Sequence, residues 1–157
     1  MNNLPESIGN LSSIKNLILG FNQLNTIPRT IGSLSTLEIL DLGKNNITAL
    51  PESIGLLESL KHLYLYYNEL KNIPESIGKI ISLKYLYLGN NQLIDIPKSI
   101  GKLKNLKYLF LRSNLLSNID SLNSLSALKY INIEKNNFTK IPESLKELEK
   151  YGVKVIK

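Results

Sequence analysis

Apolar and polar residues alternate over a short stretch of the chain, and this stretch recurs at intervals of 22 or 23 residues. In one copy, Leu86 and Leu88 alternate with Tyr85 and Tyr87. A period of two is typical of a short strand with one buried face. We therefore expect six strands, close to residues 17–19, 40–42, 63–65, 86–88, 109–111 and 131–133.

A proline precedes most of these strands. The fixed φ angle of proline suits the first turn of a helix, and a glycine ends each Pro-x-Ser-Ile-Gly stretch. We therefore expect one helical turn or a 3-10 turn at each proline. Asp120 stands where a proline is due, in a unit that is one residue shorter. The prolines are Pro5, Pro28, Pro51, Pro74, Pro97 and Pro142.

An asparagine follows each predicted strand at the same distance. An asparagine side chain that points inward at a bend can pair with loop N–H and C=O groups that have no sheet partner. A polar binding ladder is the alternative, but we assign the asparagines to the fold. They are Asn22, Asn45, Asn68, Asn91, Asn114 and Asn136.

The pattern LxxLxLxxNxL recurs six times, for example within IPESIGKIISLKYLYLGNNQL. It is the leucine-rich repeat signature, and the form with IPxSIGxL most resembles the Ras-suppressor-like repeats of eukaryotic scaffolds and similar repeats of bacterial surface and effector proteins. The resemblance implies an α/β fold, a right-handed leucine-rich repeat solenoid with a parallel sheet on the concave face and short helical or 3-10 turns on the convex face. One unit cannot bury its own apolar face, so we expect a single domain over residues 1–157.

The C-terminal end differs from the other repeats. The segment ESLKELEK has helical periodicity, and Gly152 suits the C-cap of that helix. The apolar residues Val153, Val155 and Ile156 suit a final strand. We therefore expect a capping helix and strand over residues 143–157.

The N-terminal end carries no such segment. The chain starts within a repeat, with Met1 where another repeat has Leu24. A solenoid normally needs polar end caps. We therefore expect that upstream sequence is missing, or that the first repeat frays or self-associates through its N-terminal edge. The apolar residues concerned are Ile8, Leu11, Leu17 and Leu19.

The composition excludes several kinds of chemistry. The chain has no cysteine, which rules out a disulfide, a thiol nucleophile and a Cys-based zinc site. A metal site or histidine-dependent catalysis would depend on the single histidine, His62. The motifs GxGxxG, GxxxxGKS/T and HExxH do not occur. We therefore expect no enzymatic activity, no cofactor and no metal.

The net charge of +6 is moderate, and lysines and glutamates are interspersed. Arginine occurs only as Arg29 and Arg112, so we expect no nucleic-acid partner. No apolar run approaches the roughly 18 residues of a membrane span, and the first residues do not have the pattern of a signal peptide. We expect no membrane insertion and a cytoplasmic location. The alternative is an exported bacterial protein whose leader is absent from this chain.

Nine of the eleven aromatic residues fall on the outward face of the predicted strands or just beyond it. They form either a ladder of strand-favouring rings that stabilises the sheet or an exposed binding surface. The rings cluster in repeats three to five, whereas strand propensity would spread them evenly, so we favour binding. The predicted contact residues are His62, Tyr64, Tyr66, Tyr67, Tyr85, Tyr87, Tyr108, Phe110, Arg112 and Tyr130.

A column of lysines borders this surface and is interrupted by Glu38. Such a column suits either a solvated edge or the attraction of an acidic partner. The column consists of Lys15, Lys61, Lys84, Lys107 and Lys129.

These features together predict a non-enzymatic module that binds a protein partner on its tyrosine-rich concave face. The resemblance to Ras-suppressor-like scaffolds makes a small GTPase partner conceivable. Two other functions stay open: a structural or surface-display segment of a larger protein, and carbohydrate binding by aromatic stacking.

Overall fold

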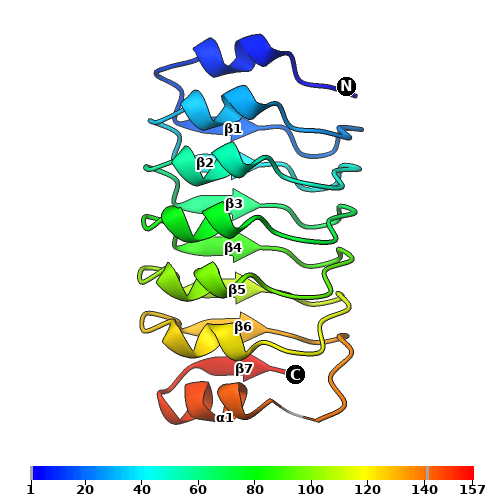
Figure 1. Cartoon of the computed structure of the whole chain (residues 1–157), viewed down its shortest axis with the longest axis vertical. Helices are drawn as coiled ribbons and strands as arrows, with labels where there is room; N and C mark the ends of the chain where they lie inside the picture. The colour runs from blue at the N-terminus through cyan, green and yellow to red at the C-terminus, as the bar shows by residue number, and fades with distance from the viewer. Residues whose placement is uncertain (1, 141) are drawn as a thin grey trace.

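The computed structural model describes residues 2–140 and 142–157. It is a solenoid in which each turn of the chain contributes one strand and one short helical segment (Figure 1). The strands pair in parallel and in chain order into one seven-stranded sheet. They are β1 (Asn16–Ile18), β2 (Ile39–Asp41), β3 (His62–Tyr64), β4 (Tyr85–Tyr87), β5 (Tyr108–Phe110), β6 (Tyr130–Asn132) and β7 (Lys154–Ile156).

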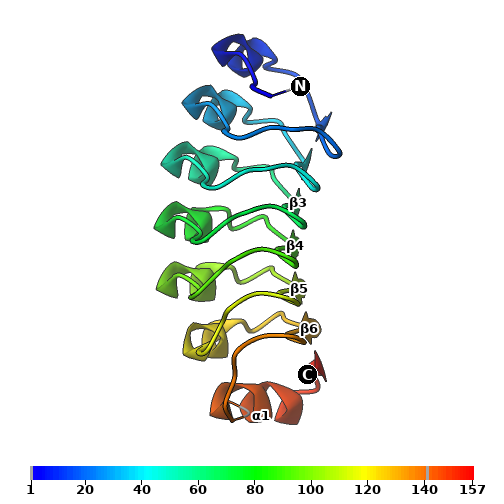
Figure 2. The same ribbon diagram turned by 90° about the vertical axis from the view of Figure 1, so that its right-hand side faces the viewer.

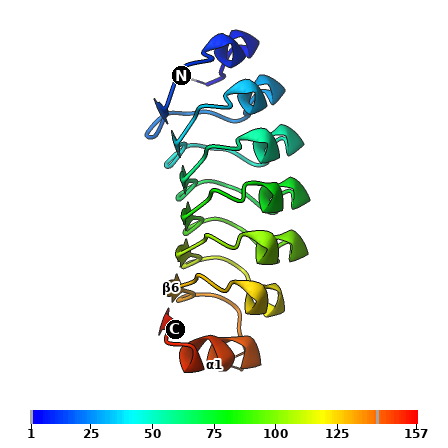
Figure 3. The ribbon, with the colours of Figure 1, turned by 90° about the vertical axis from the view of Figure 1, so that its left-hand side faces the viewer.

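The strands line the concave side of the curved stack, and the helical segments line the opposite, convex side (Figures 2 and 3). The first six segments are five-residue 3-10 helices, and the last is an α-helix. The predicted fold class is confirmed. The segments are η1 (Glu6–Asn10), η2 (Arg29–Ser33), η3 (Glu52–Leu56), η4 (Glu75–Lys79), η5 (Lys98–Lys102), η6 (Asp120–Ser124) and α1 (Glu143–Lys150).

The first six strands each lie one residue earlier than the sequence pattern predicts. The prediction placed each strand on a pair of apolar residues such as Leu86 and Leu88, whereas β4 ends between them at Tyr87. Leu88 still donates a backbone hydrogen bond of 2.8 Å to the next repeat. The extended conformation then breaks at Asn90, which has a φ of 56°. The chain turns there towards the convex side.

A helical segment begins at each proline, as predicted, but the proline is the N-cap residue immediately before the segment, which is α1 at Pro142 and a 3-10 helix at the other five. Pro74 is extended, with φ −66° and ψ 148°, and its carbonyl accepts a 3.0 Å hydrogen bond from the Ile77 N–H. The shorter sixth repeat has no proline. Its segment begins directly at Asp120, with Ile119 as the N-cap residue.

The convex segments of neighbouring repeats approach so closely that only glycine fits at one position. A Cβ atom on Gly32 would lie 2.5 Å from the carbonyl oxygen of Ser53, and a Cβ atom on Gly55 would lie 2.5 Å from that of Ser76. Non-bonded atoms do not approach so closely without a shift of the backbone. The glycine of the IPxSIGxL motif therefore allows the repeats to pack on their convex side.

The asparagines pair with backbone groups of the loops, as predicted, and from Asn45 onward they also join successive repeats, whereas among the described residues Asn22 bonds only to Leu19 and Gly20 of its own repeat. The Asn45 Oδ1 atom accepts a 2.9 Å hydrogen bond from the Leu24 N–H. Its Nδ2 atom donates to the carbonyls of Leu19 and Leu42, each at 3.0 Å. Asn68 repeats these contacts one turn later, and Asn91, Asn114 and Asn136 do so where the column continues.

The apolar residues of the first repeat are buried to different extents. Leu17 is only 7% exposed, because the second repeat covers it. Ile8 and Leu19 are partly buried against the core, whereas Leu11 is 45% exposed. Met1, which the sequence places in a leucine column, lies outside the described residues.

The C-terminal segment forms the predicted helix and strand. The α1 helix packs on η6, and Leu145 and Leu148 on its inner side are buried. Gly152 follows the helix with a φ of 81°, and its N–H donates to the Glu149 carbonyl. The chain then enters β7, which pairs with β6.

Candidate partner-binding face

Rings from neighbouring strands stack on one another along the concave face. The first stack consists of His62, Tyr85, Tyr108 and Tyr130, which pair in register on β3 to β6. The ring centroids of His62 and Tyr85 are 4.4 Å apart, and those of Tyr85 and Tyr108 are 4.7 Å apart, with interplanar angles of 7° and 2°. Tyr130 is tilted by 34° at the end of the stack.

The second stack consists of Tyr64, Tyr87 and Phe110 on β3 to β5. Its centroids are 4.6 Å apart between Tyr64 and Tyr87 and 4.3 Å apart between Tyr87 and Phe110. Parallel strands lie about 4.8 Å apart, so the sheet itself sets this spacing. Tyr130 lies 5.1 Å from Phe110 and joins the two stacks into one surface.

The stacked rings are half-buried, which affects their titration. Burial lowers the pKa of the His62 imidazole, and the ammonium groups of Lys84 and Lys61 lower it further. Burial also raises the pKa of the Tyr87 hydroxyl. The histidine is therefore neutral at pH 7 and packs as a ring against its neighbours.

Tyr66 connects the stacks to the loops that follow the strands. Its ring stands edge-on to that of Tyr64, with centroids 6.5 Å apart and an interplanar angle of 88°. It lies over Gly43, where a Cβ atom would be 2.5 Å from the ring. Burial raises the pKa of both hydroxyls, and the Asp41 carboxylate raises it further.

Sequence reasoning did not select two side chains beside Tyr67. Phe21 and Lys44 share a column with Tyr67, because each stands directly before an asparagine of the ladder. The Lys44 Nζ atom lies 4.2 Å from the Phe21 ring centroid and 5.6 Å from that of Tyr67. The shared position was visible in the sequence, but the contact between neighbouring repeats was not.

The lysine column splits into a paired part and an unpaired part. Glu38 forms ion pairs with Lys61 and Lys15, and the hydrogen bond from Lys61 lowers the pKa of its carboxyl. Arg112, another predicted contact residue, pairs with Glu134 at 3.3 Å. Among the described residues, three lysines on neighbouring repeats have no ion pair, namely Lys84, Lys107 and Lys129.

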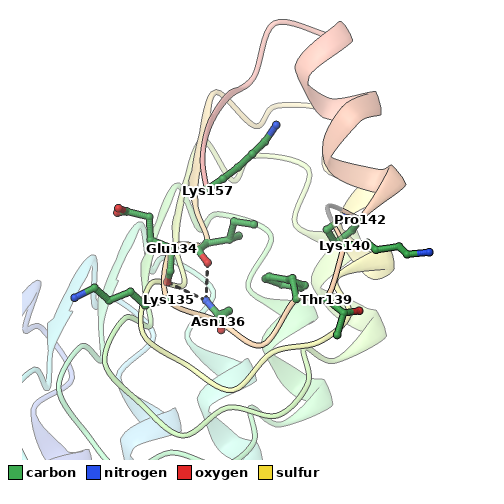
Figure 4. A pocket seen from close by; sticks show the side chains of 9 residues that line it. Glu134, Lys135, Asn136, Thr139, Lys140, Pro142 and Lys157 are labelled. Atoms are coloured by element: carbon green, nitrogen blue, oxygen red, sulfur yellow. Dashed lines mark hydrogen bonds between the residues drawn. The ribbon is translucent and has the colours of Figure 1, made fainter.

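A hollow of about 390 Å³ lies at the C-terminal end of the sheet, beside the loop that follows β6 (Figure 4). Asn136 stands in its wall and donates hydrogen bonds to the carbonyls of Ile133 and Glu134. Lys135 and Lys140 extend away on opposite sides, so their charges do not converge on a common point. The geometry gives this hollow no evident binding chemistry.

The described residues hold neither a metal-binding cluster nor a membrane-spanning helix. Across residues 2–140 and 142–157, no three His, Asp or Glu side chains come together in a way that could hold a metal ion. Within the same part of the chain, no helix combines the length and apolar character needed to cross a membrane.

Family models and solved structures agree on one class of repeat protein. A model described as a leucine-rich repeat region matches residues 59–155, and one described as a leucine-rich repeat matches residues 36–57. A comparison with curated proteins found no match.

Several solved structures share the fold. The plant peptide hormone receptor RGFR1, in complex with RGF2, is 31% identical with a TM-score of 0.82, over 93% of this chain and 24% of that one. The ectodomain of the Arabidopsis thaliana receptor kinase GASSHO1/SCHENGEN3, in complex with CASPARIAN STRIP INTEGRITY FACTOR 2, is 27% identical with a TM-score of 0.85, over 98% and 19%. The internalin inlF of Listeria monocytogenes is 26% identical with a TM-score of 0.85, over 96% and 43%. The chain spans less than half the length of each.

Proposed function

Because the chain belongs to the leucine-rich repeat family, we propose that it is a non-enzymatic interaction module that binds a protein partner on its concave face. The observation that carries this proposal is the continuous surface of the first and second stacks. Its rings come from four neighbouring strands and touch from His62 to Tyr130. Aromatic residues of this kind are enriched at protein interfaces and dominate their energetics.

The stacks are ordered before any partner arrives. Each ring inside a stack is held by rings on both sides, as Tyr87 is held between Tyr64 and Phe110. A side chain that is already fixed loses little conformational entropy on binding, which favours affinity. The aromatic face therefore suits a binding surface better than a row of mobile side chains would.

The unpaired lysines define the chemistry of the partner. The backbone N–H of Lys107 donates to the Lys84 carbonyl, and that of Lys129 donates to the Lys107 carbonyl. The three side chains therefore start from adjacent positions on neighbouring repeats. Like charges opposite each other destabilise a sheet. Carboxylates on a partner would relieve this repulsion, so we propose an acidic partner surface.

The stacking geometry argues against carbohydrate binding. Sugars stack on the free face of an aromatic ring, whereas the faces within both stacks are covered by neighbouring rings, with angles of 2° between Tyr85 and Tyr108 and 5° between Tyr87 and Phe110. The concave surface offers mainly ring edges and hydroxyl groups. These groups suit hydrogen bonding and packing with a protein.

Affinity capture tests the proposal. The wild type is compared with a Tyr64→Ala, Tyr87→Ala, Phe110→Ala variant, and proteins retained only by the wild type are identified and titrated. Each central truncation should weaken binding by roughly thirtyfold or more, the effect of a hot-spot residue. Tyr151→Ala is the matched control, because Tyr151 is 83% exposed and lies after α1.

Two outcomes would contradict the proposal. A triple variant that is equally folded by melting curve and binds the identified partner normally would place the contact elsewhere. A glycan array that gives specific, tyrosine-dependent binding, with no protein retained, would favour carbohydrate recognition instead.

A further inference from the structure

We propose that Phe21, Lys44 and Tyr67, here called the loop-edge trio, form a second contact point for an acidic segment of the partner. This inference rests on the proposed function and extends the contact surface to the first repeat. The trio lies just beyond the ends of β1, β2 and β3, one residue in each repeat.

The backbone conformation of the trio is unfavourable for its large side chains. Phe21 and Tyr67 have φ angles of 57° and 53°, in the left-handed region that bulky residues rarely adopt. In the fourth repeat the same position is Asn90, with a φ of 56°. Asparagine tolerates this region much better than an aromatic residue. The fold therefore does not require an aromatic residue at this position.

Core packing does not explain the two rings either. Phe21 is 70% exposed and Tyr67 is 53% exposed, so each leaves more than half of its surface in solvent. The left-handed conformation recurs at this position in all six repeats, so the fold requires the conformation but not a ring in it. Two exposed rings in a left-handed conformation therefore indicate that the trio has a role other than folding.

The charge of Lys44 indicates what the trio would bind. Its ammonium group lies between the two rings, at 4.2 Å and 5.6 Å from their centroids. No ion pair involves it among the described residues. A carboxylate could approach this ammonium from solvent while an apolar neighbour in the partner covers the rings.

The trio is continuous with the proposed binding face. The Tyr67 ring stands edge-on to Tyr66 at 6.1 Å, and Tyr66 stands edge-on to Tyr64 at 6.5 Å. One partner can therefore contact the stacks and the trio together. The same electrostatic preference holds at both places, because the unpaired lysines and Lys44 are all cationic.

A random-peptide display library panned on the full chain supplies the probe, which is the tightest peptide selected. We expect this peptide to be rich in Asp and Glu beside apolar residues. The Phe21→Asn, Tyr67→Asn variant should bind it at least about tenfold more weakly and unfold at a higher denaturant concentration than the wild type. A merely structural role for the rings would lower the unfolding midpoint instead.

Two matched variants isolate the charge and the backbone effect. Lys44→Gln should weaken binding of the peptide, whereas Lys135→Gln, at the same position in the sixth repeat with a φ of 54°, should not. Ser113→Asn, which also has a left-handed backbone, should raise the unfolding midpoint and leave binding unchanged.

The outcomes separate this inference from the proposed function. If Tyr87→Ala loses the peptide while the Phe21→Asn, Tyr67→Asn variant binds normally, the trio is wrong and the concave face stands. If the Phe21→Asn, Tyr67→Asn variant loses the peptide while Tyr87→Ala binds normally, the trio is a contact point and the assignment of binding to the stacks is wrong. If neither variant loses the peptide, if no peptide enriches, or if the selected peptides are basic, the inference is overturned.

Discussion

The inner and outer faces of the sheet are built from alternate residues of the same strands. Leu40, Leu63, Leu86 and Leu109 lie on the inner face and are fully buried, one directly beside the next. The outward residues on either side of them change from Ile39 in the second repeat to Tyr108 in the fifth. A solenoid therefore separates the residues that build the fold from those that are free to vary, within a strand of three residues.

The largest effect should come from the inner face. Leu86→Ala should lower the free energy of unfolding by about 2–5 kcal/mol, because it leaves a cavity in a fully buried column. Leu56→Ala is the control, since Leu56 is 55% exposed, and it should cost far less. Urea denaturation measures both. Equal midpoints for the two variants would contradict the assigned core.

The asparagine ladder should come next. Asn91→Ala removes the partner of the Leu70 N–H and of the Leu65 and Leu88 carbonyls. Unpaired buried groups cost about 1–3 kcal/mol, and partner affinity should be unchanged after correction for unfolding. Asn46→Ala, at an exposed asparagine that follows the ladder residue Asn45, should be nearly neutral. A folded Asn91→Ala protein that no longer bound its partner would make the ladder functional.

A change on the outer face should cost less stability. Tyr87→Leu keeps apolar contact but cannot stack, so it should lower the free energy of unfolding by about 0.5–1.5 kcal/mol. Tyr151→Leu, at an exposed ring outside the face, is the control. Thermal melts at one protein concentration compare the two. A Tyr87→Leu loss as large as that of Leu86→Ala would remove the distinction between the faces.

The smallest effect concerns His62. Its pKa in the folded protein is lowered by burial and by nearby lysines, so the unfolded chain takes up a proton more readily. Stability is thus fully present above the unfolded pKa of about 6.5 and is lost as the pH falls through the folded pKa. His62→Gln should reduce this loss, measured as the change in urea midpoint on acidification. A wild-type midpoint that rose on acidification relative to His62→Gln would reverse the assigned sign.

The fold was predictable because each buried position recurs in several repeats of the sequence. Leu63 alone fits a strand or a helix, but its recurrence as Leu86 and Leu109 identifies a repeat, and the repeat determines the register of the sheet. The strand ends were predicted one residue late, because hydropathy marks the leucine at 88 and does not show the left-handed conformation at Asn90.

The binding surface was less predictable than the fold. Columns of rings could be read from the spacing, but the contact of Lys44 with Phe21 depends on side-chain directions in two repeats. The ion pair between Arg112 and Glu134 likewise joins residues 22 positions apart. Whether the predicted contact residues bind a partner stays a prediction until the capture experiment is made.

The asparagine ladder has a mechanical consequence. Each asparagine from Asn45 onward ties its repeat to the one before it, as Asn68 does through the Ile47 N–H and the Leu42 carbonyl. If the two ends of the chain were pulled apart, repeats would detach in sequence from an end, and each of 23 residues would release roughly 80 Å of chain. The molecule would lengthen in steps, and the aromatic face would remain whole until the third repeat or the sixth gave way.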